Sequence, residues 1–274
     1  MGLLLPHKRK ITVYPDMMTV SIPGVGGRVG GGERGKIQHF SADSRYRLFR
    51  LLHKLKFERV SFVTLTYPAE FPTNPRKYKA HLKEYRRRFE IRWGKIPAVW
   101  RLEFQDRGAP HYHLMYLDAP FIPVPEWCAL WSDVIHTKDE NHRKIGVDVK
   151  LITQGKEAGL VASYLGKYVA KVDERCNVDS ERSVGRWWGK WNIQEEIPIE
   201  IEVMDWQAAD VVANALSSRR SDSSWQPADP TICTVFGDSM GRDDFQHVII
   251  RCVGQATRSR AKRRARIFDG SGVN

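Results

Sequence analysis

The 274-residue chain has few cysteines and no long hydrophobic run, and each absence excludes a class of protein. Its cysteines (Cys128, Cys176, Cys233 and Cys252) lie far apart and include no C-x-x-C pair. This spacing argues against a disulfide framework and against a cysteine-based zinc site. No stretch approaches the roughly 20 apolar residues of a membrane-spanning helix. The start, MGLLLPHKRK, places a short apolar run before the charges, the reverse of a signal peptide. We therefore expect a protein that is neither exported nor inserted into a membrane.

The chain has fewer acidic than basic residues. Asp and Glu number 32 against 44 Lys and Arg, which gives a net charge of +12. Such an excess indicates a polyanionic partner, with nucleic acid the first candidate and an anionic membrane surface the second. Hydrophobic residues make up 42% of the chain, which is enough for an ordinary packed core.

The two ends of the chain lack the patterning of packed elements. Residues 21–35 (SIPGVGGRVGGGERG) are rich in glycine, and residues 217–230 are rich in Ser and Pro. Residues 258–266 (RSRAKRRAR) place six basic residues in nine, which is typical of either a solvated tail or a nucleic-acid-binding arm. The sequence thus predicts a flexible glycine-rich arm over 1–35, a domain over 36–216, and a linker with a basic extension over 217–274.

The middle of the chain alternates between helical and strand patterns. Apolar residues at helical spacing predict helices over 41–56, 74–93, 125–135 and 157–172. Runs rich in β-branched and aromatic residues predict strands over 59–66, 98–105, 111–117, 147–152 and 197–203. This order, with one tight hairpin, predicts an α+β fold in which helices pack on one face of an antiparallel sheet.

The hairpin over residues 100–116 (WRLEFQDRGAPHYHLMY) separates two kinds of side chain. Because alternate residues of a strand face opposite sides, one face carries only Trp100, Leu102, Phe104, Tyr112, Leu114 and Tyr116. The other carries Arg101, Glu103, Gln105, His111 and His113. A turn centred on Gly108 would place Glu103 opposite His113 and Gln105 opposite His111, within cross-strand reach. Two imidazoles and a carboxylate predict a site for Mg²⁺ or Mn²⁺. The alternative is a solvated hairpin face with two ordinary histidines.

The predicted helix over 157–172 contains a second group of polar residues. At about 3.6 residues per turn, Tyr164, Lys167, Tyr168 and Lys171 share one arc beside an apolar arc that can pack on the sheet. A phenol, with a pKa of about 10, is a weak nucleophile near neutral pH. A metal that polarises a phosphate, together with nearby lysines, would activate it. The alternative is a basic amphipathic helix whose tyrosines lie at the edge of the core.

The predicted helix over 74–93 is strongly basic. Neutralised phosphates give proteins salt-sensitive affinity for DNA, so this helix is a candidate surface for the DNA backbone, although a solvated helix face has the same composition. The candidate residues are Arg76, Lys77, Lys79, Lys83, Arg86, Arg87, Arg88 and Arg92.

Three motifs in this order carry a family likeness: F-V-T-L-T (62–66), E-F-Q-D-R-G-A-P-H-Y-H (103–113) and Y-L-G-K-Y-V-A-K (164–171). The chain resembles the HUH endonucleases that initiate rolling-circle replication, most closely the replication-associated proteins of the filamentous-phage gene II type. G-R-W-W-G (185–189) resembles a further segment of that group, and the likeness covers about residues 59–191.

The resemblance implies a five-stranded antiparallel sheet with flanking helices. It implies that His111, His113 and Glu103 bind a divalent metal, Mg²⁺ or Mn²⁺. It also implies that Tyr164 or Tyr168, or both in turn, is the nucleophile and that Lys167 or Lys171 assists it.

The expected function is metal-dependent nicking and rejoining of single-stranded or melted origin DNA through a covalent 5′-phosphotyrosine. A host helicase and polymerase are the further partners expected, in the cytoplasm of a bacterial host cell. Two alternatives remain from the sequence: an HUH transposase or relaxase with the same chemistry, and a non-catalytic DNA-binding protein with the same fold.

Overall fold

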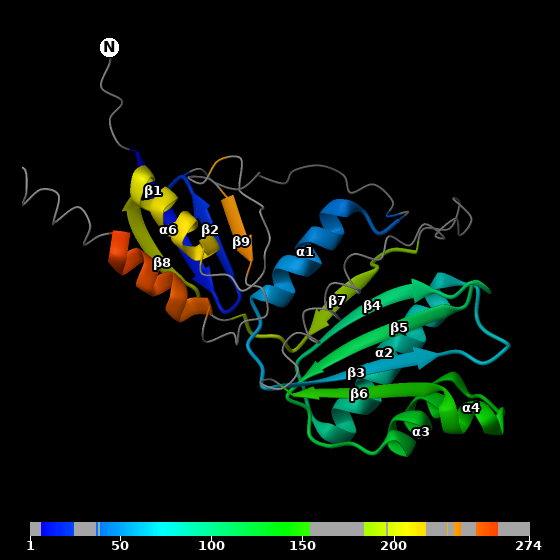
Figure 1. Ribbon diagram of the computed structural model, residues 1–274. Helices are drawn as coiled ribbons and strands as arrows, with labels where there is room; N and C mark the ends of the chain where they lie inside the picture. Colours follow the sequence, from blue (N-terminus) through cyan, green and yellow to red (C-terminus); the bar gives the residue numbers. More distant parts are fainter. Residues whose placement is uncertain are drawn as a thin grey trace, which may run out of the picture. The chain divides into compact units, whose positions relative to one another are not determined.

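The computed structural model describes residues 7–24, 37, 39–153, 184–195, 197–217, 229, 233–236 and 245–256. The chain divides into two compact units (Figure 1). We call them the five-stranded unit (Gly32–Phe49 and Phe57–Gln194) and the four-stranded unit (Met1–Gly31, Arg50–Lys56 and Glu195–Asn274). The predicted helix over 157–172 lies outside the described residues.

The sheet of the five-stranded unit has the order β6-β3-β5-β4-β7, and all its neighbouring strands are antiparallel. This confirms the predicted α+β class with a five-stranded antiparallel sheet. The strands are β3 (Arg59–Thr66), β4 (Ala98–Phe104), β5 (Pro110–Leu117), β6 (Val147–Thr153) and β7 (Trp188–Trp191). The first four agree with predicted strands to within one residue, whereas β7 was not predicted.

Helix α2 (Pro75–Trp93) packs on the apolar face of this sheet and lies behind it in Figure 1. It begins at Asn74, whose side chain accepts a hydrogen bond from the Arg76 N–H at 2.9 Å. Its buried residues recur every three or four positions: Tyr78, Leu82, Tyr85 and Phe89. Tyr112 of β5 donates its hydroxyl proton to the Tyr78 carbonyl at 3.1 Å, and Phe89 stacks on Tyr116 with ring centroids 4.4 Å apart.

Two further helices belong to this unit, α3 (Val124–Ile135) and the short α4 (Glu140–Ile145). Trp127 and Trp131 of α3 are almost fully buried, and Trp127 stacks on Phe89 at 5.3 Å. The aromatic residues of the hairpin and of two helices therefore form one core on this face. The histidines of β5 project from the opposite face, because they alternate with Tyr112 and Leu114.

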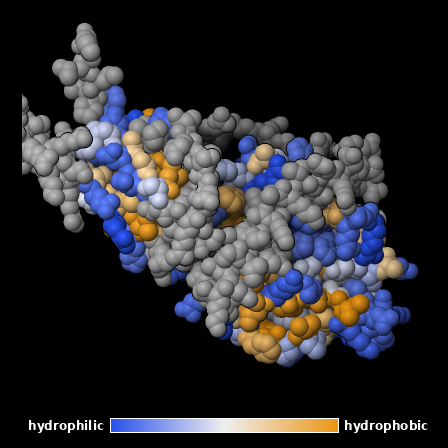
Figure 2. Space-filling model, in the orientation of Figure 1, coloured by the Kyte–Doolittle hydropathy of each residue, from blue (hydrophilic) through white to orange (hydrophobic). Residues whose placement is uncertain are grey.

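The surface of the five-stranded unit is mixed. Figure 2 shows hydrophobic residues gathered around β6 and α3 and hydrophilic ones around the tip of the β4–β5 hairpin. Leu151 of the edge strand β6 is 53% exposed. None of the helices in the described part of the chain is long and apolar enough to cross a bilayer.

The four-stranded unit has the sheet order β8-β1-β2-β9, with β1 (Lys8–Tyr14), β2 (Met17–Ser21), β8 (Ile199–Met204) and β9 (Cys233–Phe236). Helix α6 (Asp205–Ser217) and a helix over residues 245–256 also belong to it. Ile11, Val13, Val211 and Ile249 belong to its core. Helix α1 (Ala42–His53) confirms the predicted helix over 41–56, and the boundary between the units falls within it.

These elements correct the predicted domain boundaries. Residues 8–21 form a β-hairpin rather than part of a flexible arm. Residues 199–217 belong to the four-stranded unit rather than to a domain over 36–216, and residues 233–236 and 245–256 are a strand and a helix of that unit rather than linker and tail. The reason is long-range pairing: β1 pairs with β8, about 190 positions further along the chain, and local sequence patterns do not reveal so distant a partner.

Candidate functional site

The β4–β5 hairpin carries the predicted metal ligands, and its register differs from the prediction. Glu103 lies opposite His111, and Arg101 lies opposite His113. The prediction that Glu103 pairs with His113 and Gln105 with His111 is therefore wrong by two residues, although every one of these side chains keeps its face because the shift is even.

The cause of the shift is the turn. The Gln105 N–H donates to the Ala109 carbonyl at 3.0 Å, and the Gly108 N–H donates to the Gln105 carbonyl at 2.7 Å. Three residues therefore form the loop, with Gly108 at φ 79°. This is the three-residue hairpin loop that needs a left-handed residue at its end. The turn is centred on Arg107 rather than on Gly108, and Gln105 lies at its base, beyond the reach of a pair with His111.

The three predicted ligands nevertheless gather on one side of the sheet. Glu103 Oε2 lies 3.1 Å from His113 Nε2, a diagonal contact across the hairpin. The His111 and His113 rings meet edge to face with centroids 4.6 Å apart. The Glu103 and His113 side chains are only 13% and 15% exposed, so their interaction is partly shielded from water. The sequence thus correctly predicted that these residues lie together, though not which pairs face each other.

Two threonines of β3 orient the histidines. Thr64 lies opposite His113 and Thr66 lies opposite His111. In both pairs the threonine Oγ1 is 3.3 Å from the histidine Nδ1. A polar partner on one ring nitrogen fixes the orientation of the imidazole and the role of the other nitrogen. Sequence analysis assigned these residues no role; the signal for it was the appearance of Thr at alternate positions of F-V-T-L-T.

Arg101 is the other residue whose role sequence analysis missed. Its side chain is almost fully buried, and its Nη1 lies 2.9 Å from Glu103 Oε1. Its guanidinium carbon also lies 5.1 Å from the centroid of the Phe40 ring. Each oxygen of the Glu103 carboxylate therefore has a partner, Arg101 on one side and His113 on the other. A buried charge pair of this kind holds the carboxylate in a single orientation.

The donor set fits a divalent cation in its chemistry, since imidazole nitrogen and carboxylate oxygen are ligands of first-row metals. Among the described residues, no group of three or more His, Cys, Asp or Glu is arranged to hold such an ion. Arg101 and His113 contact the two oxygens of the Glu103 carboxylate, so holding an ion would require the carboxylate to exchange one of these partners. Metal binding by Glu103, His111 and His113 therefore stays a prediction.

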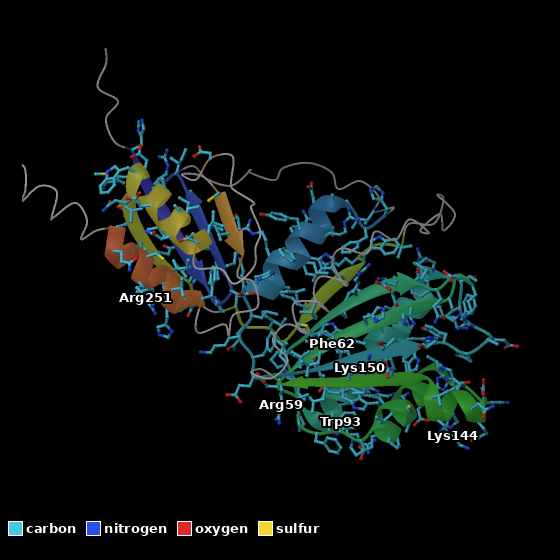
Figure 3. The ribbon with its side chains drawn as sticks, viewed as in Figure 1. Arg59, Phe62, Trp93, Lys144, Lys150 and Arg251 are labelled. Carbon is cyan, nitrogen blue, oxygen red and sulfur yellow. The ribbon has the colours of Figure 1, made fainter. Side chains whose placement is uncertain are left out.

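The same face continues across β3 and β6. Phe62 lies opposite Lys150, and both are labelled in Figure 3. The next pair on this face of the two strands is Thr64 with Asp148, which places an exposed carboxylate beyond the threonine that contacts His113. Lys150 and Asp148 thus give this side of the cluster one charge of each sign. The predicted catalytic residues Tyr164, Lys167, Tyr168 and Lys171 lie outside the described residues.

The predicted DNA-binding residues lie on α2, on the opposite side of the sheet from the histidines, and most of them already have partners. Arg86 pairs with Glu90 at 2.7 Å, Arg87 and Arg88 both pair with Glu84 at 2.7 Å, and Arg92 pairs with Glu126 at 2.8 Å. Lys79 donates to the Arg186 carbonyl and lies over the Trp100 ring, and burial lowers its pKa to about 8.

The remaining three, Arg76, Lys77 and Lys83, have exposed side chains that form no ion pair within the described part of the chain. Contact of α2 with DNA stays a prediction, and two of its three available cations stand at the N-terminal end of the helix.

The segment that builds this site also has relatives. Residues 60–173 match the family described as replication-associated protein ORF2/G2P. The match begins in β3 and includes the whole hairpin and the tyrosine-containing segment 164–171. It agrees with the likeness seen in the motifs and supports a role in replication.

One relative of the chain is viral. "Uncharacterized protein 1" of Halorubrum pleomorphic virus 1 is 34% identical over 79 residues, which cover 27% of this chain and 15% of that protein. The chain therefore aligns with only a small part of this relative. No solved structure matches the chain.

The threonine contacts lead to a first prediction. We expect Thr64→Val and Thr66→Val each to weaken Mn²⁺ binding by about tenfold, since partners of metal-bound histidines are typically worth 10–100-fold in affinity. Valine keeps the shape and favours a strand, so folding should be retained. Calorimetric titration with Mn²⁺ measures the effect. Thr64→Ser and Thr66→Ser, which keep the hydroxyl, are the controls. Valine variants that bind Mn²⁺ as tightly as the unchanged protein would refute the orienting role.

Proposed function

We propose that the protein initiates rolling-circle replication by nicking a single DNA strand at an origin and later rejoining it. The observation that carries this proposal is the cluster of Glu103, His111 and His113 on one sheet face, oriented by Thr64 and Thr66, within a segment that matches a replication-associated family. The net charge of +12 supports a polyanionic substrate.

The proposed chemistry is a transfer between two oxygen atoms. The phenol oxygen of Tyr164 or Tyr168 loses its proton to water and attacks the scissile phosphorus. The bond from phosphorus to the 3′ oxygen breaks, so the 5′ phosphate stays on the tyrosine. Lys167 or Lys171 stabilises the phenolate and supplies a proton to the departing 3′ oxygen. In the reverse direction a 3′ hydroxyl attacks the phosphotyrosine and restores the diester, and no ATP is needed because the bond energy is conserved.

The histidine cluster has a distinct part in this scheme. Glu103, His111 and His113 would hold Mg²⁺ or Mn²⁺, and such an ion supplies charge stabilisation at the phosphate oxygens. Thr64 and Thr66 keep both imidazoles in place before the substrate arrives. Arg101 keeps the Glu103 carboxylate pointed at His113. The released 3′ hydroxyl would prime synthesis by a host polymerase, with strand separation by a host helicase.

The test is formation of the covalent adduct. The full-length protein is incubated with Mn²⁺ and single-stranded oligonucleotides tiled across the replicon that encodes it. We expect one oligonucleotide to give a denaturation-resistant adduct, and peptide mass analysis to place it on Tyr164 or Tyr168. Changing both tyrosines to Phe should remove the adduct, and the single changes assign the nucleophile.

Tyr46→Phe, at an exposed tyrosine of α1, is the control and should leave the adduct unchanged. An adduct that persists when both Tyr164 and Tyr168 are Phe would contradict the assignment of the nucleophile. A protein that binds these oligonucleotides but forms no adduct with any of them is a non-catalytic DNA-binding protein, and the proposal then fails.

A further inference from the structure

A pocket of about 720 Å³ lies where β3 ends. It is built by the loop that follows β3, the first turns of α2, and the segment between α3 and α4. The lining residues with relevant chemistry are Tyr67, Phe71, Lys77, His81, His136 and Lys138. Its volume is within the range of about 300–1,000 Å³ that is typical of ligand sites.

The walls of the pocket are held in place by specific contacts. Tyr67 is buried, its hydroxyl lies 3.0 Å from His81 Nδ1, and its ring meets Trp131 edge to face at 5.0 Å. Arg107, at the tip of the β4–β5 hairpin, donates to the Tyr67 and Pro68 carbonyls at 2.5 and 2.6 Å. The same guanidinium lies 5.0 Å from the centroid of the Phe71 ring. The hairpin that carries the histidines therefore also fixes this loop.

The pocket offers positive charge. Neither Lys77 nor Lys138 forms an ion pair or a side-chain hydrogen bond within the described part of the chain, in contrast to the paired arginines further along α2. Burial lowers the pKa of His81, and electrostatic interactions with Lys77 and His136 lower it further.

Two carboxylates also line the pocket, and among the described residues neither forms an ion pair with Lys77 or Lys138. Asp139 accepts hydrogen bonds from the Asn141 and His142 N–H groups at 3.0 Å each, so it serves as the N-cap of α4. Glu70 is exposed on the loop after β3. Two lysines beside an aromatic ring are the groups that bind a nucleotide in a single strand, through its phosphate and through stacking on its base.

The pocket and the histidine cluster meet at the end of β3. Thr66 contacts His111, and the next residue, Tyr67, lines the pocket. We infer that this pocket binds one nucleotide of the same DNA strand that the histidine face receives, with its phosphate on Lys77 and Lys138 and its base against Phe71. This inference rests on the proposed function for the presence of a single strand. The pocket would be a second binding site for the same DNA strand, at the end of β3.

The test measures, by fluorescence anisotropy, the binding of a fluorescent 20-nucleotide single strand to the full-length protein. The buffer contains EDTA, so that the binding measured does not depend on a metal. We expect Lys77→Ala with Lys138→Ala to weaken binding about tenfold. The slope of log affinity against log salt should fall by about 0.7, the value for one phosphate contact on a single strand. Phe71→Ala should weaken binding about tenfold with no change of slope, because stacking is not ionic.

Lys95→Ala with Lys144→Ala is the matched control, since it removes the same charge from exposed positions outside the pocket. An equal loss in both double variants would overturn the inference, as would wild-type binding by the pocket variant. Saturation of the pocket by micromolar thymidine 5′-monophosphate without displacement of the strand would also overturn it, in favour of a site for a free nucleotide.

Unchanged protein that binds no single strand contradicts the proposed function itself. Pocket variants that bind and form the adduct normally contradict only this inference.

Discussion

Replacing His113 with alanine is expected to reduce covalent attachment to DNA at least 100-fold while leaving most strand binding in place. His113 is the central member of the cluster, because it contacts both Glu103 and Thr64. Its loss removes a predicted metal ligand and one partner of the Glu103 carboxylate together. Loss of a ligand should exceed the 10–100-fold effect of losing an outer partner. Backbone binding depends on lysines and arginines elsewhere, so it should change little.

Two measurements separate this result from simple unfolding. Mn²⁺ titration of the His113→Ala protein should show a loss of affinity in parallel with the loss of adduct, while the circular dichroism spectrum stays unchanged. His247→Ala, at an exposed histidine of the four-stranded unit, is the control and should retain both activities. If His113→Ala forms the adduct at the normal rate, the cluster is not the catalytic centre and the proposed chemistry fails.

The hairpin shows how far local pattern determines this site. Alternation alone places Glu103, His111 and His113 on one face, because each strand residue takes the side opposite to its neighbours. The exact partner of each residue depends on the turn. Because Gly108, with its positive φ, ends the loop rather than forming its centre, the register of the two strands differs by two residues from the predicted one. Sequence reasoning therefore predicts the members of the cluster better than their pairing.

Residues whose role comes from another strand are harder to predict. Thr64 and Thr66 become partners of the histidines only because β3 lies beside β5 in the sheet. Likewise, the charge of α2 is evident in the sequence, but the helix has an apolar side that takes it to the face opposite the histidines, where Tyr78 and Phe89 are buried. The four-stranded unit is the extreme case, since β1 needs β8 as its partner.

The largest expected effect on stability is at Arg101. We expect Arg101→Leu to lower the free energy of unfolding by about 3–5 kcal/mol, because it leaves the Glu103 carboxylate partly buried without its guanidinium partner. Urea unfolding followed by tryptophan fluorescence measures this. Removal of an exposed charge is expected to cost far less: Arg87→Leu, which breaks a pair with Glu84 on the surface of α2, should leave the free energy of unfolding nearly unchanged.

A double-mutant cycle identifies the origin of that loss. Glu103→Leu alone leaves the buried Arg101 guanidinium without its carboxylate partner, so it should lower the free energy of unfolding as much as Arg101→Leu does. The protein with both changes has no buried charge left from the pair and loses mainly the bond from Glu103 to His113, so it should be only about 1 kcal/mol less stable than the unchanged protein. If the stability losses of the two single variants simply add in the double variant, Arg101 acts through its packing on Phe40 rather than through Glu103. In that case Arg101 could not be the residue that orients the carboxylate for catalysis.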